Sequence, residues 1–131
     1  MVAVLALVTW TTSGVIGLAM LLRWHRPPRV ALVHVATASV GLAAWIGYLA
    51  ADRPHWLAWA TFAWLTLINV LGDMLMVGGW RSRTPEPRPR AVRAYVAAAG
   101  DLLSGWRRLA LVHGLLAPVT YVLVLVTALV G

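Results

Sequence analysis

The amino-acid sequence predicts an all-α integral membrane protein built as a four-helix bundle. Hydrophobic residues make up 61% of the 131 residues and charged residues only 11%, a composition found in membrane proteins and rare among soluble domains. Four charge-poor runs each have roughly the 20 residues that an α-helix needs to cross the hydrocarbon core of a bilayer. A repeated ten-residue pattern further indicates that these helices form two similar hairpins.

The predicted spans take up nearly the whole chain and form a single transmembrane domain. They cover residues 2–22, 30–51, 56–80 and 109–130. The first run has no basic residue before it and is too long for the core of a signal peptide, so we expect it to remain as a helix. Pro27 and Pro28 end the first span and start the second.

Residues 81–106 are predicted to form a cytoplasmic linker and a short amphipathic helix. Three prolines within residues 85–89 favour an extended linker. Apolar residues then recur at helical spacing: Val92, Tyr95, Val96, Ala99, Leu102 and Leu103. We expect this helix to lie on the membrane interface and to cover the inner mouth of the bundle, or alternatively to dock a soluble partner.

The arginines predict the orientation in the membrane. Three lie between the first and second spans, seven lie between the third and fourth, and only Arg53 lies on the other side. By the positive-inside rule both arginine-rich connections are cytoplasmic and both termini are outside. The absence of lysine is typical of a GC-rich bacterial genome, so we expect a bacterial inner membrane.

The charge and the cysteine count exclude several classes of function. No base-stacking or recognition module accompanies the net charge of +7, so we expect anionic lipid headgroups and not nucleic acid beside the arginines. The chain has no cysteine, which excludes disulfides, thiolate metal sites and iron–sulfur clusters. Any electron transfer therefore needs a bound cofactor.

A histidine recurs in the same setting near the start of two spans. Residues 29–38 and 108–117 both read Arg, an apolar residue, Ala-Leu-Val-His, three further residues and Ala. A shorter echo joins the first and third spans: Val15-Ile16-Gly17 and Val70-Leu71-Gly72. We expect two parallel hairpins related by a pseudo-two-fold axis along the membrane normal. That symmetry makes His34 and His113 equivalent.

Two imidazoles at matched depth invite a shared ligand, because a polar ring in hydrocarbon is costly without a partner. In an up-down bundle the second and fourth helices are diagonal neighbours, and cofactors bind between facing side chains in such cores. We therefore predict one haem b with His34 and His113 as its axial ligands. Arg29, Arg107 and Arg108 lie near the membrane edge, where they would pair with the haem propionates.

In these features the chain resembles four-helix membrane b-type cytochromes, in which two histidines hold haem between diagonal helices. The resemblance is architectural and rests on the two Ala-Leu-Val-His copies in their four-helix setting. It implies electron transfer, with a quinone, a membrane redox partner or a second copy of the chain as candidate partners. A second histidine pair toward the outer side is missing, so transfer between two haems is not expected.

Asp73 is the only carboxylate predicted within a span, near the depth of both histidines. It is expected to support a histidine N–H, to pair with an arginine or to transfer a proton, and we include it among the cofactor-binding residues. Proton transfer would fit an alternative function, a small proton-coupled transporter. Another alternative is a non-catalytic subunit of a larger membrane complex. The histidines themselves could instead be structural or hold another metal or a proton.

Overall fold

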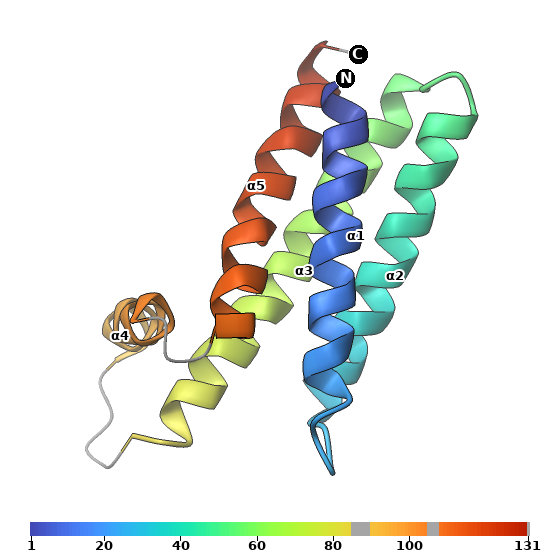
Figure 1. The fold of residues 1–131 in the computed structure, drawn as a ribbon. Coiled ribbons are helices and arrows are strands. Elements are labelled where there is room, and N and C mark those ends of the chain that lie inside the picture. Colours follow the sequence, from blue (N-terminus) through green and yellow to red (C-terminus); the bar gives the residue numbers. More distant parts are fainter. Residues whose placement is uncertain (85–89, 105–107, 131) are drawn as a thin grey trace.

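The computed structural model describes residues 1–84, 90–104 and 108–130, and in these it contains five helices and no strand (Figure 1). The helices are α1 (Val2–Leu21), α2 (Arg29–Ala50), α3 (His55–Arg81), α4 (Ala91–Leu103) and α5 (Arg108–Val130). All but α4 are long and apolar enough to cross a membrane. For the described residues this confirms the prediction of an all-helical chain with four helices that are long and apolar enough to span a membrane.

The outer surface of the bundle is apolar. At most 22% of the most apolar stretch of any long helix is buried within the protein. Val8, Ile46 and Leu129 are each more than half exposed. A helix packed in a soluble bundle would carry charged or polar residues on such a face. Contact with lipid therefore explains why these faces are apolar.

The four long helices run side by side, and each packs against two others. The packed pairs are α1 with α2, α2 with α3, α3 with α5, and α5 with α1. Across the described part of the chain this leaves α2 and α5 as one diagonal pair and α1 and α3 as the other. Figure 1 shows that α1 begins and α5 ends at the same end of the bundle, whereas α4 lies near the opposite end.

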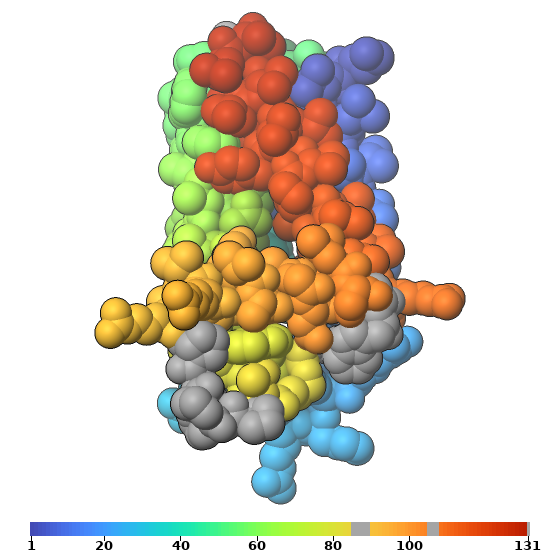
Figure 2. All heavy atoms as spheres, turned by 90° about the vertical axis from the view of Figure 1, so that its left-hand side faces the viewer, coloured from blue at the N-terminus to red at the C-terminus, as the bar shows by residue number. Residues whose placement is uncertain are grey.

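Helix α4 lies crosswise against the flank formed by α3 and α5 (Figures 1 and 2). Its contact face consists of small residues, since Ala94 and Ala98 are almost completely buried. Its last turn fits closely onto α5, because a Cβ atom at Gly114 would lie only 2.8 Å from the Cδ2 atom of Leu102. Glycine at this position therefore permits the close approach of the two helices.

The structure differs from the sequence analysis in how α4 packs. Within the described residues α4 contacts α3 and α5 only, so it covers a flank of the bundle and not its inner mouth. Val92 and Val96, two of the apolar residues that recur at helical spacing, are 77% and 65% exposed. Short alanine side chains allow α4 to lie closer to the bundle than valines would. The larger side chains consequently face away from the bundle.

Aromatic residues pack the half of the bundle that is farther from α4. Trp45 stacks on Tyr48, with ring centroids 4.7 Å apart, and donates its indole N–H to the backbone carbonyl of Ala3 at 3.0 Å. Trp10 is 4% exposed and lies against Gly41 of α2. A Cβ atom at Gly41 would lie within 3 Å of ring atoms of both Trp10 and Trp64. Glycine is therefore required where these two indoles meet α2.

We expect the substitution Gly41→Ala to destabilise the bundle, because the added methyl group overlaps two indole rings that are held by other contacts. Overpacking of this kind costs about 1–3 kcal/mol. The matched control is Gly47→Ala on the same helix, where nothing lies within 4 Å of the added Cβ atom. Thermal unfolding in detergent micelles should show a lower midpoint for Gly41→Ala than for Gly47→Ala. Equal midpoints would contradict the packing described for Gly41.

Candidate functional site

The two repeated histidines meet inside the bundle. His34 is the sixth residue of α2 and His113 is the sixth residue of α5, so both rings lie at a similar depth. Their ring centroids are 6.1 Å apart and their planes are inclined by 80°. Both side chains are partly buried. The structure thus brings together the two residues that the repeated decapeptide singled out.

A backbone carbonyl of a neighbouring helix orients each ring. His34 Nδ1 lies 3.1 Å from the carbonyl oxygen of Ile68 in α3, and His113 Nδ1 lies 2.9 Å from that of Ser13 in α1. A carbonyl oxygen can only accept, so each Nδ1 is the donor and carries a proton. In a neutral imidazole the lone pair then resides on Nε2. Histidines that ligate metals through one nitrogen typically donate the other N–H in this way.

The Ser13 side chain adds a second contact to one of the two rings. Its hydroxyl oxygen lies 3.0 Å from His113 Nδ1. The same N–H is therefore placed between the hydroxyl and the carbonyl of one residue. The position at which α3 contacts His34 is Ile68, whose side chain has no hydroxyl, so the two rings share the carbonyl contact but not this additional one.

A glycine lies against each imidazole. A Cβ atom at Gly17 of α1 would lie 3.0 Å from Cε1 of His113, and one at Gly72 of α3 would lie 3.4 Å from Cε1 of His34. Both glycines end the short echo found in the sequence, and each comes four residues after the residue whose carbonyl accepts the bond from the same ring. Ser13 and Gly17 also have the small-xxx-small spacing that lets membrane helices pack closely. The same four-residue spacing recurs at Ile68 and Gly72. This recurrence is the sequence feature from which the contacts with the two histidines could have been predicted.

A small cavity of about 50 Å³ adjoins the two rings. Its walls come from all four long helices and include the polar side chains of Ser13, Asn69 and Thr120. A water molecule occupies roughly 30 Å³ of liquid volume, so this space suits a water molecule or a single metal ion. A porphyrin does not fit into it with the helices as they are packed.

The spacing of the rings suits two nitrogen ligands of one metal. Imidazoles on opposite sides of a metal have centroids about 6 Å apart, because each metal–nitrogen bond is about 2 Å and the nitrogen lies about 1 Å from its ring centre. The observed distance is 6.1 Å. Among the described residues there is no cluster of three or more His, Cys, Asp or Glu side chains that could hold a metal. Further ligands would therefore have to come from a macrocycle or from solvent.

The arginines that the sequence analysis assigned to haem propionates lie at the helix ends. Arg29 is the first residue of α2 and Arg108 is the first residue of α5, and both are exposed. Each precedes its histidine by five residues, or about 7.5 Å along the helix axis. Arg107 lies outside the described residues. The two described arginines thus stand about one and a half turns nearer the helix ends than the imidazoles.

Asp73 lies apart from the histidine pair. It is exposed on α3, and the side chain of Tyr95 in α4 lies beside it. Because backbone carbonyls already accept from both Nδ1 atoms, Asp73 is not the group that orients either ring. An ion pair near α4 joins Arg83 to Asp101 at 2.9 Å. The Asp73 carboxylate thus lies on the side of α3 that faces α4, and the carbonyls of Ile68 and Ser13 are the groups that face the two Nδ1 atoms.

Comparison with known proteins does not identify a family. The chain matches no protein-family model, no curated protein and no solved structure. Its function is therefore inferred from the chemistry of its own residues, first of all the two imidazoles.

We expect the metal-free protein in bilayers to hold His34 and His113 as the tautomer protonated on Nδ1, because each Nδ1 faces a carbonyl oxygen. Solid-state NMR of ¹⁵N-histidine-labelled protein measures which ring nitrogen carries the proton. Substitution of His25 and His55 by Gln removes the other two histidines and leaves only the paired signals. Rings protonated on Nε2 would contradict the hydrogen bonds described above.

Proposed function

We propose that this protein is a membrane b-type cytochrome that binds one haem b between His34 and His113 and transfers electrons. The observation that carries the proposal is the pair of imidazoles 6.1 Å apart, each donating its Nδ1–H to a carbonyl and keeping Nε2 for a ligand. A structural histidine would need only the carbonyl bond. A shared metal also accounts for the pairing and the matched depth of the two rings.

The residues around the pair have distinct roles in this proposal. The carbonyls of Ser13 and Ile68 fix the orientation of the rings. By accepting the Nδ1–H they also make the Nε2 lone pair more basic and so a stronger metal ligand. Arg29 and Arg108 supply cations near the membrane edge, where propionates would lie. Bound haem would supply one-electron iron chemistry. With two histidines on the iron, we expect electron transfer and not the binding of a further ligand by the metal.

Haem binding requires the helices around the histidines to move apart, because the adjoining cavity measures only about 50 Å³. The cavity wall is partly made of small residues, including Gly14, Ala38 and Ala117. Gly14 has no other atom within 4 Å of the position that a Cβ would occupy. Because these residues are small, a flat ligand that enters here has to displace fewer protein atoms than elsewhere along the cavity wall.

The contacts of the histidines support the proposed pseudo-two-fold relation of two hairpins, α1–α2 and α3–α5. His34 of the first hairpin bonds to Ile68 of the second, and His113 of the second bonds to Ser13 of the first. The exchange is reciprocal. In each case the carbonyl lies four residues before a glycine that contacts the same ring. A duplicated hairpin accounts for both contacts with one arrangement.

We also propose that the arginine-rich end of the bundle faces the cytoplasm and that α4 lies in the inner membrane interface. Both connections that carry the arginines are at the end where α4 packs (Figure 1). Val92 and Val96 of α4 point away from the bundle and would then contact lipid. Both termini would then lie on the outer, non-cytoplasmic side of the membrane, which we take to be a bacterial inner membrane.

Purified protein from cells supplied with haem should show a Soret band and sharp α and β bands after reduction. We expect His34→Ala and His113→Ala each to abolish the bis-histidine spectrum, because each removes one axial ligand. His55→Ala is the control, since His55 is exposed at the start of α3 and bonds to Trp59. Colourless wild-type protein, or histidine variants that keep the reduced bands, would refute the proposal.

A single transition-metal ion without a porphyrin is the second candidate, and the size of the cavity favours it. Metal analysis of the purified protein separates the two ligands. A stoichiometric metal without a Soret band, lost in both histidine variants, would establish this candidate in place of haem. The transporter alternative has less support, because Asp73 is exposed beside Tyr95 and does not line the cavity between the helices.

The chain has no cysteine, so single cysteines can report its orientation without background. We expect Ser82→Cys, at the end of α3, to be protected from a membrane-impermeant maleimide in intact cells. Asp52→Cys, in the turn between α2 and α3, should be labelled. The reverse pattern would place the termini in the cytoplasm, while leaving the haem proposal intact.

A further inference from the structure

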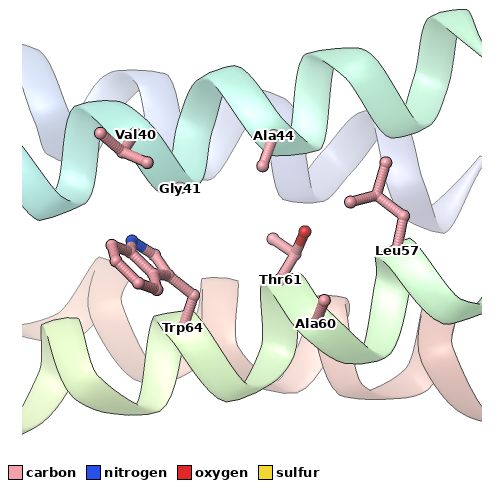
Figure 3. Close-up of a pocket in the computed structure, with 7 residues that line it drawn as sticks. All are labelled: Val40, Gly41, Ala44, Leu57, Ala60, Thr61 and Trp64. Atoms are coloured by element: carbon pink, nitrogen blue, oxygen red, sulfur yellow. The ribbon is translucent and has the colours of Figure 1, made fainter.

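A second cavity opens between α2 and α3, in the half of the bundle that lies away from α4. Its volume is about 180 Å³. Figure 3 shows its lining, which consists of Val40, Gly41, Ala44, Leu57, Ala60, Thr61 and Trp64. The α2 wall carries only small side chains beside Val40, and Trp64 projects from α3 toward Val40 and Gly41. Val40 is 57% exposed, so the cavity opens onto the lipid-facing surface.

Thr61 is the polar exception in this lining. Its side chain is 1% exposed, and its hydroxyl has no hydrogen-bond partner in the structure. Figure 3 shows this hydroxyl pointing across the cavity toward Ala44 of α2. The other threonines of α2 and α3, Thr37 and Thr66, both donate to a carbonyl of their own helix. A buried hydroxyl without a partner costs free energy, so a ligand acceptor in the cavity would stabilise Thr61.

The size and chemistry of the cavity limit its occupant. An apolar protein cavity of about 150 Å³ is large enough to bind benzene, so about 180 Å³ accommodates one six-membered ring. Water is a poor occupant, because it needs two to four polar partners and the lining offers only the Thr61 hydroxyl, the Trp64 N–H being bonded to the Thr37 carbonyl. A plain acyl chain would leave the hydroxyl unpaired. The fitting ligand is a membrane-soluble ring that bears a carbonyl.

We propose that this cavity binds the head ring of a membrane quinone. One ring carbonyl accepts a hydrogen bond from Thr61, the ring lies against Trp64, and the isoprenoid tail leaves through the opening beside Val40 into the bilayer. The quinone ring then satisfies the only unpaired polar group of the lining, and the remaining contacts are apolar. The second ring carbonyl lies against apolar groups both in lipid and in the cavity, so transfer of the ring from lipid into the cavity gains one hydrogen bond.

The choice of a quinone rests in part on the proposed electron transfer. The two cavities share no residue, but one layer of side chains separates them: Trp10 lines the histidine cavity and contacts Gly41, which lines the outer one. Gly41 follows His34 by seven residues, or about 10 Å along α2. The quinone ring would therefore lie close to the proposed haem, on its outer side.

Titration with decylubiquinone in detergent micelles, followed by tryptophan fluorescence quenching, tests the site. We expect saturable quenching by the wild type. Thr61→Val keeps the shape of the side chain and removes the donor, so it should weaken binding about 5- to 10-fold. Ala44→Phe fills the cavity and should abolish saturable binding. Thr12→Val is the matched control, because the Thr12 hydroxyl donates to the Val8 carbonyl on the outer face of α1.

The double variant His34→Ala/His113→Ala separates this proposal from the haem proposal. It should lose haem and keep quinone affinity, because neither histidine lines the outer cavity. Quenching that never saturates, or that is the same in wild type, Thr61→Val and Ala44→Phe, would overturn the quinone site even if the protein binds haem. Saturable binding that Thr61→Val leaves unchanged and that a long-chain alkane displaces would assign the cavity to a lipid chain, which also overturns it. A colourless protein that binds quinone through Thr61 would overturn only the haem.

Discussion

Within the hydrocarbon core of a membrane, a polar side chain has no water to bond and must find its partner inside the protein. The two histidines meet this constraint in the same way, by donating from Nδ1 to a backbone carbonyl of an adjacent helix. A helical carbonyl has a second lone pair and can accept this bond without giving up its own helical one. Each ring is thereby attached to the opposite hairpin, and the packing of all four long helices is coupled to the position of the imidazoles.

The same constraint shapes the rest of the bundle. The Thr120 hydroxyl donates to Thr9 at 2.9 Å, joining α5 to α1, and the Trp64 indole donates to the carbonyl of Thr37, joining α3 to α2. These bonds cross the same two helix pairs as the histidine contacts do. Among the described residues, the Thr61 hydroxyl and the Arg81 Nε are the buried side-chain polar atoms that lack a partner. The Thr61 hydroxyl lies where the bundle is hollowed and open to lipid.

Glycine determines where aromatic rings can reach the interior. Gly17 and Gly72 lie against the imidazoles. Gly41 leaves room for the indole rings of Trp10 and Trp64, about two helical turns farther from α4 than His34. Trp10 therefore belongs to the walls of the histidine cavity and also touches the helix that lines the outer one. The bundle is divided along its length into a histidine half near the arginines and α4, and an aromatic half near the turn between α2 and α3. Close packing at Gly41 brings the two halves into contact.

The sequence by itself determined the spans, because length and apolar composition decide which segments can cross a bilayer, and it singled out His34 and His113 through their repeat. Only the tertiary structure decided which atoms face those rings. Backbone carbonyls leave no signature in residue type, so Ser13 and Ile68 could not be recognised as acceptors. The direction of Asp73 toward Tyr95 and the alanine face of α4 likewise depend on how helices rotate against one another. Helices that are apolar on every side provide no periodic pattern from which that rotation could be read.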